Sequence, residues 1–304
     1  MKLIIQPDDG IKPLMKAVRH AKHSIDLLVF RFDRLDLEKA LAAAVARGVF
    51  VRLLIAQKNG GGEKRLRALE QRMLAAGITI TRTSDDLPRY HGKMTIIDGV
   101  LYVLGFNYTR QDIERSRSFG LITRDTKLVK EAIHLFEADS TRQPYDPGGD
   151  KRFVVSPETS RERLSAFIGG ARKHLLIYDD RIQDKLILRL LRERLDAGVE
   201  IRVIGKIDKA VDGIPARKPA DLRLHVRAMV RDGSGVFLGS QSLRKPELDA
   251  RREIGVIVND RRIAHKIQSV FEQDWSNGKG KAKDQHADDV DESGKAVTQA
   301  TSAV

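Results

Sequence analysis

The chain carries two copies of one short pattern of a histidine, a cation and an aspartate, 134 positions apart. The members are His91, Lys93 and Asp98 in the first copy, and His225, Arg227 and Asp232 in the second. An imidazole, with a pKa near neutrality, can attack phosphorus or carry a proton, and fixed cations neutralise phosphate oxygens. The pattern therefore predicts chemistry on a phosphodiester.

A glycine and an amide extend both copies in the same register. Gly105 and Asn107 follow the first aspartate, and Gly239 and Gln241 follow the second. One such match alone is a weak signal, whereas two copies in matched halves are a strong one. The repeat predicts that the same groups surround the substrate from two sides.

The sequence around the motifs is duplicated as well. Segments 21–28 and 47–52 are similar to segments 171–178 and 197–202, each at a spacing of 150 residues. The first half therefore contains 16 extra residues before its motif. They fall in a glycine-rich turn at 59–62 and a helical run, Glu63–Ala75, which we expect to form part of the rim of the site.

The pair of motifs resembles the HKD motif of the phospholipase D superfamily, and the resemblance spans roughly residues 11–275. It implies an α/β fold of two similar phospholipase D-like α/β/α sandwich halves with mixed sheets and an active site at their interface. The expected boundaries are a first half at 1–140, a linker at 141–157, a second half at 158–275 and a disordered tail at 276–304.

The resemblance also implies a mechanism without a metal or another cofactor. One neutral histidine attacks phosphorus and becomes a phosphohistidine, while the other histidine, protonated, gives its proton to the leaving oxygen. Lys93 and Arg227 would clamp the phosphate oxygens, and Asn107 and Gln241 would donate amide hydrogens. The two aspartates, Asp98 and Asp232, would organise the ends of their strands, as turn-forming aspartates do.

Family patterns place a carboxylate or an amide behind each histidine. Glu253 fits that place in the second half, and its counterpart in the first half is Ser118. Because an imidazole backed by a carboxylate holds its proton more firmly, we assign His225 with Glu253 as the general acid/base and His91 as the nucleophile. The reverse assignment stays open.

Other residues near the motifs are candidates for contact with the substrate. They are Arg89 and Tyr90, which directly precede the first motif, and Ser240, which precedes the second amide. Lys58 and Arg82 are weaker candidates for steering an anion.

The second motif departs from the family pattern. Arg227 replaces its lysine, and Gln241 is one methylene longer than asparagine. Both changes keep the charge and the hydrogen-bonding type, although an arginine grips phosphate with a different reach. A catalytically degenerate anion-binding protein is therefore one alternative to an enzyme.

Helices and strands that alternate along both halves must position these groups. Helical spacing predicts helices at Lys12–His23, Asp36–Ala46, Glu63–Ala75, Lys127–Ala138, Lys185–Leu195 and Ile263–Asp274. Apolar, β-branched runs predict strands at Ser24–Phe32, Val49–Ala56, Ile78–Thr81, Met94–Ile97, Leu101–Phe106, Phe119–Thr123, Leu175–Tyr178, Val199–Ile204, Leu224–Val230, Val236–Leu238 and Glu253–Val258. This order is typical of mixed sheets that helices cover on both faces.

Composition indicates a cytoplasmic protein. Of the 304 residues, 41% are apolar and 32% are charged, and cysteine is absent. No run of eighteen apolar residues occurs, and the first residues lack the apolar core of a signal peptide. We therefore expect no transmembrane segment, no disulfide and no thiolate metal site.

The net charge of +13 favours partners that carry phosphate. Segments 106–109 and 136–145 are similar to bacterial phospholipase D and cardiolipin-synthase-like proteins, so a phospholipid headgroup is the favoured substrate, hydrolysed or transferred. Such an enzyme would contact an anionic membrane peripherally. A metal-independent nuclease or nucleic-acid end-processing enzyme is the other alternative, since it would suit the same charge.

Overall fold

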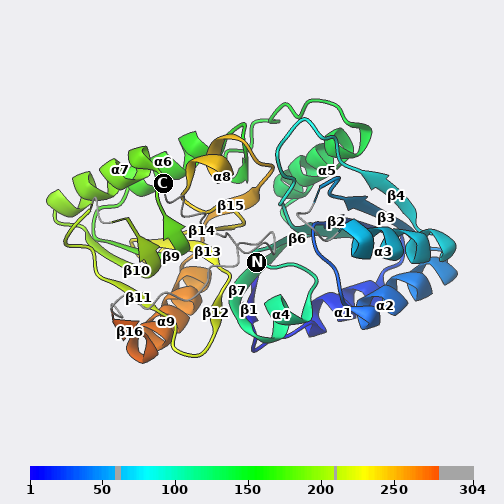
Figure 1. Cartoon of the computed structure of the whole chain (residues 1–304), viewed down its shortest axis with the longest axis horizontal. Helices are drawn as coiled ribbons and strands as arrows, with labels where there is room; N and C mark the ends of the chain where they lie inside the picture. The colour runs from blue at the N-terminus through cyan, green and yellow to red at the C-terminus, as the bar shows by residue number, and fades with distance from the viewer. Residues whose placement is uncertain (59–62, 209–210, 281–304) are drawn as a thin grey trace, which may run out of the picture.

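Apolar strands from the two halves of the chain form two mixed sheets that face each other (Figure 1). This computed structural model describes residues 1–58, 63–208 and 211–280. The glycine-rich turn at 59–62 and residues 281–304 of the expected tail lie outside the described residues.

The first sheet follows the strand order β1-β7-β6-β5-β2-β3-β4. Its strands are β1 (Lys2–Gln6), β2 (Ser24–Val29), β3 (Phe50–Ile55), β4 (Thr79–Arg82), β5 (Met94–Ile97), β6 (Val100–Leu104) and β7 (Ser116–Thr123). The β2, β3 and β4 strands are parallel, whereas β5, β6, β7 and β1 join by antiparallel pairing. The expected mixed sheet is therefore confirmed.

The second sheet follows the order β16-β11-β10-β9-β13-β14-β15-β8. Its strands are β8 (Phe153–Val155), β9 (His174–Ile182), β10 (Glu200–Ile207), β11 (Ala216–Lys218), β13 (Arg227–Arg231), β14 (Gly235–Gly239), β15 (Ile254–Asn259) and β16 (Lys279–Gly280). From β8 to β11 this path repeats the path from β1 to β4 in the first sheet. The two halves are thus similar in topology as well as in sequence.

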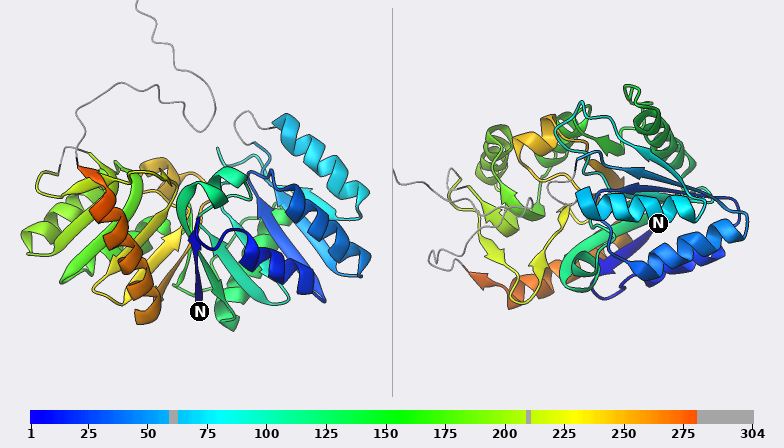
Figure 2. Two further views of the ribbon diagram at one scale, coloured as in Figure 1. Left: turned by 90° about the horizontal axis from the view of Figure 1, so that it is seen from below. Right: turned by 45° about the vertical axis from the view of Figure 1, so that its right-hand side comes forward.

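Helices cover the two sheets from outside and flank the space between them. They are α1 (Lys12–His20), α2 (Leu35–Ala46), α3 (Glu63–Ala75), α4 (Arg110–Glu114), α5 (Thr126–Thr141), α6 (Ser160–Gly169), α7 (Lys185–Asp196), α8 (Lys245–Asp249) and α9 (Arg261–Asn277). Asp125, Asp184 and Asp260 cap the N-termini of α5, α7 and α9, since each side chain accepts hydrogen bonds from backbone N–H groups of the first turn. The views in Figure 2 place α1–α3 and α6–α7 at opposite flanks of the molecule.

Three segments differ from the sequence prediction. The segment expected to be a linker contains β8, which pairs with β15 as β1 pairs with β7. The predicted strand Leu224–Val230 is interrupted: β12 (Arg223–Leu224) pairs with β7 of the first half, and only β13 joins the second sheet. The chain remains ordered beyond 275, because α9 runs to Asn277 and β16 pairs with β11.

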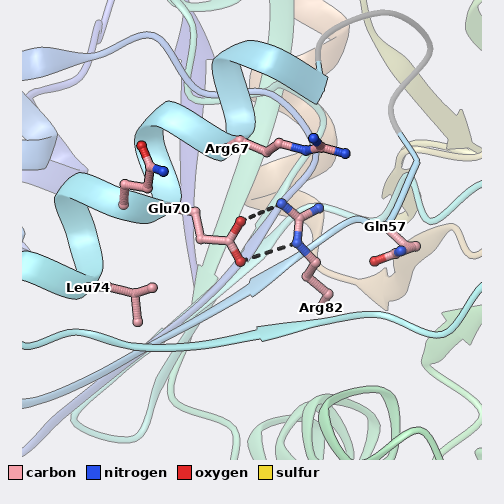
Figure 3. Close-up of a pocket in the computed structure, with 6 residues that line it drawn as sticks. Gln57, Arg67, Glu70, Leu74 and Arg82 are labelled. Atoms are coloured by element: carbon pink, nitrogen blue, oxygen red, sulfur yellow. Dashed lines mark hydrogen bonds and ion pairs between the residues drawn. The ribbon is translucent and has the colours of Figure 1, made fainter.

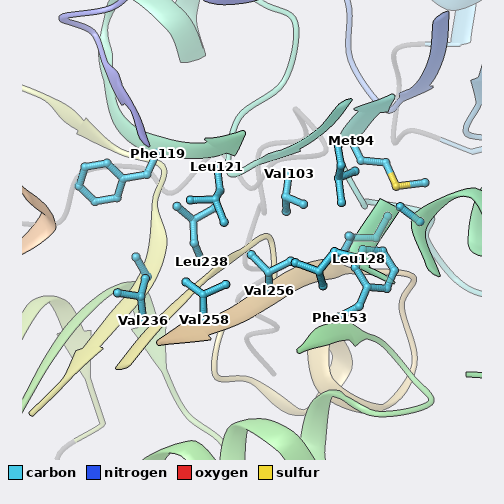
Figure 4. Close-up of a cluster of buried hydrophobic side chains, with 14 of the residues drawn as sticks. Met94, Val103, Phe119, Leu121, Leu128, Phe153, Val236, Leu238, Val256 and Val258 are labelled. Carbon is cyan, nitrogen blue, oxygen red and sulfur yellow. The ribbon is translucent and has the colours of Figure 1, made fainter. Parts of the chain in front are cut away.

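The two sheets share one apolar core (Figure 4). Val103 and Leu121 of the first sheet face Leu238 and Val256 of the second, and all four side chains are buried. Separate clusters fill the space beneath α1–α3 and beneath α6–α8. Burial of apolar side chains from both halves therefore holds the halves together.

Leu238→Ala is expected to lower the free energy of unfolding by about 2–5 kcal/mol, because it opens a cavity between the sheets. Leu238 is only 1% exposed. Denaturant unfolding measures the change, and Leu35→Ala, at a side chain 57% exposed on α2, is the matched control with an expected change within about 0.5 kcal/mol. Equal changes for the two variants would contradict the shared core.

Candidate active site

The two motif histidines lie where each half meets the other. His91 directly precedes the residues that lead into β5, and its backbone N–H donates to the carbonyl oxygen of Arg252 at 2.7 Å. His225 lies between β12 and β13, and its N–H donates to the carbonyl oxygen of Arg117 at 3.2 Å. Each histidine is therefore hydrogen bonded to a strand region of the opposite half.

Both ring nitrogens of His91 have defined partners. The Nδ1–H donates to the carboxylate of Glu253, at 3.0 Å from Oε2 and 3.1 Å from Oε1. The Nε2 accepts from Nζ of Lys93 at 2.9 Å, and the same ammonium donates to the His91 carbonyl oxygen at 2.7 Å. The Phe30 and His91 rings pack in a T-shaped arrangement, with centroids 4.6 Å apart. These contacts place the proton of the ring on Nδ1 and direct the Nε2 lone pair toward the ammonium of Lys93.

Glu253 supports His91, so the pairing of Glu253 with His225 expected from sequence was wrong. The start of β15 crosses from the second half onto the first motif, which brings Glu253 to the histidine of the other half. Burial alone would raise the pKa of the Glu253 carboxyl, but His91 and Lys93 outweigh it and lower this pKa. The carboxylate is thus ionised and fully buried behind the ring.

His225 faces a carboxylate that the sequence analysis missed. Its Nδ1 lies 3.7 Å from Oδ2 of Asp112, in α4. Burial lowers the pKa of His225 to about 3; neighbouring cations add to this effect, and Asp112 opposes it. The histidine is therefore neutral at pH 7 before a substrate brings negative charge. An aspartate in the first turn of a Thr-capped helix is common, so no distinct signal in the sequence marks Asp112.

Asp112 is held in place by groups from both halves. Its Oδ2 accepts from the backbone N–H of Asn107 at 2.9 Å and from Nδ2 of Asn107 at 2.7 Å, while Oδ1 accepts from Arg223 at 2.8 Å. Burial alone would raise the pKa of Asp112, but His225, Arg223 and Asn107 bring it to about 2. Asp112 is thus an ionised anchor beside the second histidine.

The cations of the two motifs both influence His225. Lys93 of the first motif and Arg227 of the second are both close enough to His225 to lower its pKa. Both cations are buried, and Arg227 forms an ion pair of 2.9 Å with Asp180, at the end of β9. The charges of both motif cations therefore act on the same histidine.

The two amides are used differently from each other. Both amide hydrogens of Gln241 have structural partners, since Nε2 donates to the Val154 carbonyl oxygen at 3.0 Å and to Oγ of Ser160 at 3.1 Å. The expected role of Gln241 as a phosphate donor is therefore wrong in this structure, because its extra methylene lets the amide reach β8. Asn107 donates only one amide hydrogen to Asp112, so its other hydrogen remains a candidate phosphate donor.

Asp98 and Asp232 close the far ends of their strands. The carboxylate of Asp98 accepts backbone hydrogen bonds from Lys22, His23 and Ser24, and that of Asp232 accepts from Arg172, Lys173 and His174. Both residues have positive φ, 47° and 50°, as turn aspartates tolerate. These contacts support the structural role inferred for the two aspartates. They do not involve the motif histidines, His91 and His225.

The remaining predicted residues divide between the rim and the interior. Arg89 is half-buried, with its guanidinium over the Phe30 ring at 5.4 Å, so it stays a candidate rim residue. Tyr90 is buried and donates its hydroxyl hydrogen to Asp86, so its side chain does not lie on the rim of the site, where contact with the substrate was expected. Ser240 accepts from the backbone N–H of Ile254 and adds a hydrogen bond that lowers the pKa of Glu253, which makes it a support of the site.

The insertion helix α3 and residues at the ends of β3 and β4 line a groove (Figure 3). The groove has a volume of about 410 Å³ and is lined by Gln57, Arg67, Glu70, Gln71, Leu74 and Arg82. Gln57 and Arg82 lie at the carboxyl ends of β3 and β4, the same edge at which β5 begins. Arg82 is held by the carboxylate of Glu70. The groove thus lies at the sheet edge from which β5 begins, and the place of α3 on the rim of the site stays a prediction.

Two kinds of feature are absent from the described part of the chain. Within residues 1–58, 63–208 and 211–280, no group of three or more histidines, cysteines, aspartates and glutamates is arranged to hold a metal ion. Over the same ranges, no helix has the length and apolar character that crossing a bilayer requires.

The fully buried Asp179 should make stability depend on pH. Burial, with Asp180 next to it, raises the pKa of Asp179 to about 7, above the value near 3.9 of an unfolded chain. The folded state therefore binds more protons between these values, and stability falls as pH rises through about 4 to 7. Asp179→Asn is expected to reduce the fall in Tm between pH 5 and pH 8 by several degrees, measured by thermal unfolding.

Asp98→Asn is the control for this pH dependence. Burial alone would raise the pKa of Asp98, but backbone N–H donors outweigh it and lower the pKa, so Asp98 does not titrate between pH 5 and pH 8. Its substitution should shift Tm equally at both pH values. Parallel Tm curves for the wild type and Asp179→Asn would refute the raised pKa.

Comparisons with known proteins agree with this geometry. The sequence model of the family described as "Cardiolipin synthase, PLD-like domain" matches residues 14–140 and 164–275. The mitochondrial cardiolipin hydrolase of Homo sapiens is 31% identical over 165 residues, which cover 51% of this chain and 62% of that protein. The corresponding protein of Mus musculus is 30% identical over 145 residues, covering 46% and 61%. The chain thus spans less than two thirds of the length of these relatives.

Solved structures share the fold over nearly the whole chain. The phosphatidylserine synthase of Haemophilus influenzae aligns with a TM-score of 0.71 at 11% identity, covering 91% of this chain and 87% of that one. The polyphosphate kinase of Porphyromonas gingivalis aligns with a TM-score of 0.73 at 21% identity, covering 89% and 46%. At these identities the likeness concerns the fold. Together with the family match over both halves, it confirms the resemblance drawn from the motifs: the chain belongs to the phospholipase D-like family of cardiolipin synthase domains.

Proposed function

We propose that the protein is a phosphodiesterase of phospholipase D type, which hydrolyses or transfers a phospholipid headgroup through a covalent phosphohistidine. The observation that carries this proposal is the state of His91. Glu253 accepts its Nδ1–H, and Lys93 donates to its Nε2. The charge of Lys93 also lowers the pKa of the second histidine, His225. A nucleophile, its orienting carboxylate, a phosphate-binding cation and a proton carrier therefore meet in one buried place.

The first step forms the bond between Nε2 of His91 and phosphorus, and the bond to the leaving oxygen breaks. His225, which takes up a proton from water when the anionic substrate binds, gives that proton to the leaving oxygen, so the leaving group departs as an alcohol. Lys93 and Arg227 neutralise the non-bridging oxygens, and Asn107 offers its remaining amide hydrogen. In the second step a water or an alcohol loses a proton to His225 and attacks phosphorus, which breaks the bond to His91.

His91 is the better nucleophile for a reason different from the one drawn from sequence. Its Nδ1 proton is held by Glu253, so the lone pair that can attack is on Nε2, which accepts from Lys93 in this structure. The buried carboxylate stabilises the positive charge that the ring gains when it bonds to phosphorus. His225 has a lowered pKa because burial and cations surround it. An incoming phosphate diester offsets these cations, and the proton that His225 then carries is readily given away.

A phospholipid is the favoured substrate because two relatives are named cardiolipin hydrolases and the fold recurs in a phosphatidylserine synthase. A nuclease is the second candidate, since the net charge is +13 and exposed Arg67 lines the groove, with exposed Lys58 next in sequence to its lining residue Gln57. Both candidates use the same mechanism on a phosphodiester. Only the substrate assay separates them.

The experiment that tests the proposal offers vesicles of cardiolipin or phosphatidylglycerol, single- and double-stranded DNA, and bis-p-nitrophenyl phosphate, all with EDTA present. We expect turnover of the phospholipids, because the mechanism requires no metal. Preferential cleavage of DNA would favour the nuclease. A protein that binds anions without turning over any of these substrates would support the degenerate alternative, with Arg227 and Gln241 as its marks.

A further inference from the structure

The residues before the start of β15 hold His91 at two points. The carbonyl oxygen of Arg252 accepts the His91 backbone N–H at 2.7 Å, and the N–H of Arg252 donates to the Arg89 carbonyl oxygen at 2.8 Å. The next residue, Glu253, holds the imidazole Nδ1. Ile254 packs so closely on Gly92 that a Cβ there would lie 2.6 Å from it. The position of this strand therefore determines both the backbone and the ring orientation of His91.

The side chain of Arg252 anchors that strand back to the half that contains His91. Its guanidinium lies 3.1 Å from Oδ1 of Asp139, near the end of α5, and donates to Glu158 at 2.6 Å and to the Ser156 carbonyl oxygen at 2.9 Å. Arg252 is 4% exposed and Asp139 is 2% exposed. The guanidinium also lies over the Tyr90 ring at 5.7 Å. Neither Arg252 nor Asp139 contacts a nitrogen of the His91 ring.

Arg117 repeats this arrangement in the opposite direction. Its carbonyl oxygen accepts the His225 N–H at 3.2 Å. Its guanidinium donates twice to Asp274, near the end of α9, at 2.8 Å and 3.0 Å, and once to the Gln6 carbonyl oxygen at 2.8 Å. The hydroxyl of Tyr178 donates to the same aspartate at 2.7 Å. All of these side chains are buried.

The two ion pairs are counterparts under the internal duplication. Arg117 and Arg252 are 135 positions apart, as are Asp139 and Asp274. In each pair the aspartate and one motif histidine belong to the same half. The arginine belongs to the opposite half, and its backbone carbonyl oxygen accepts the N–H of that histidine. The connection therefore runs from Asp139 through Arg252 to His91, and from Asp274 through Arg117 to His225.

We infer that these ion pairs are two latches across the interface, in which Asp139 and Arg252 position His91, and Asp274 and Arg117 position His225. The inference rests on the proposed function, because it assigns these four residues as positioning residues for the two histidines. A single apolar core already holds the halves together. The latches align the two histidines. Each latch ties the backbone segment whose carbonyl oxygen accepts the histidine N–H to a helix in the half that contains this histidine.

A purely structural role would give a different result from a latch. Buried ion pairs often contribute little net stability, and the loss of one partner leaves the other unpaired. A general loosening of the interface would affect both histidines alike. A latch instead predicts that each aspartate affects only one histidine, with Asp139 paired to His91 and Asp274 paired to His225.

The experiment records the imidazole signals of isotopically labelled histidine by NMR, in the full chain, for Asp139→Asn and Asp274→Asn. His91→Gln and His225→Gln serve only to assign the two signals. We expect Asp139→Asn to shift the ring signals of His91 alone and Asp274→Asn to shift those of His225 alone. Asp249→Asn is the control, because Asp249 of α8 pairs with Arg161 of α6 within the second half and has no part in either latch, and it should shift neither signal.

Kinetics give a second readout of the same latches. Single-turnover assays with bis-p-nitrophenyl phosphate should show Asp139→Asn slowing formation of the covalent adduct about 10- to 100-fold, as small displacements of reacting groups do. Asp274→Asn should slow its breakdown to a similar extent, where His225 must take a proton. KM should change little in both variants, since neither side chain contacts the substrate.

Three outcomes would overturn the inference: shifts of both histidines by either aspartate variant, shifts of neither, or the reversed pairing. If an asparagine variant fails to fold, Arg252→Lys and Arg117→Lys replace it, because they keep the charge but lose the forked contact. An inactive wild type with the expected pattern of NMR shifts would refute the proposed function and leave the latches standing. An active wild type without that pattern would refute the latches alone.

Discussion

His225→Asn is expected to accumulate a covalent phosphoryl adduct on His91, whereas His91→Asn is expected to form none. Both variants should lose turnover of bis-p-nitrophenyl phosphate by about 10³-fold or more, since each removes a group that acts directly on the reacting bonds. The difference arises because the activated leaving group of this substrate departs without full protonation. Attack by His91 can then proceed while breakdown, which needs His225 to take a proton from water, is slowed.

Intact-mass measurement of acid-sensitive adducts after rapid mixing checks this prediction. Peptide mapping at neutral or basic pH, where phosphohistidine survives, locates the modified residue. An adduct on His225 in the His91→Asn variant would reverse the two roles. Turnover that survives in both variants would rule out the two-histidine mechanism.

The motif residues of the candidate site could be predicted from sequence because the internal duplication repeats them in the same register. His91 and His225 are found by the shared register alone, and the α/β halves follow from alternating helix and strand patterns. The insertion helix was also predicted with its bounds, since Glu63–Ala75 has helical spacing and no counterpart in the second half. These features are local or periodic, so the sequence carries them directly.

The pairing of groups across the interface could not be predicted in the same way. Glu253 lies in the second half, and only the packing of the two sheets brings it to His91 instead of His225. Asp112 resembles any aspartate in the first turn of a helix. In both cases the sequence offers the correct type of residue, while the partner depends on long-range geometry.

The predicted role of Gln241 as a phosphate donor was wrong for a related reason. Its amide donates to Val154 of β8, and β8 was itself hidden in a segment with the composition of a linker. Three apolar residues between prolines and glycines are too few for a periodic signal. The register of the motif therefore placed Gln241 correctly along the chain, but the strand that holds its side chain was not foreseen.

Glu253→Gln is expected to lower kcat by at least about 100-fold with little change in KM. The carboxylate does not reach the substrate in the proposed mechanism, but it holds the Nδ1 proton of His91 and offsets the positive charge of the phosphohistidine. A glutamine of the same shape lacks that charge, and its amide nitrogen can turn toward Nδ1 and favour the wrong tautomer. Asparagine in place of a triad aspartate has an effect of this kind in serine proteases.

Glu247→Gln is a matched control for this substitution. Glu247 is also buried in the second half, but its partners are Arg244 and Arg251, and neither Glu247 nor these arginines belongs to the two motifs. Its substitution should leave kcat within about threefold, so that loss of a buried carboxylate alone does not account for the result. If instead Glu253→Gln raised KM and kept kcat, the carboxylate would act on substrate binding, and the assignment of His91 as nucleophile would lose its main physical support.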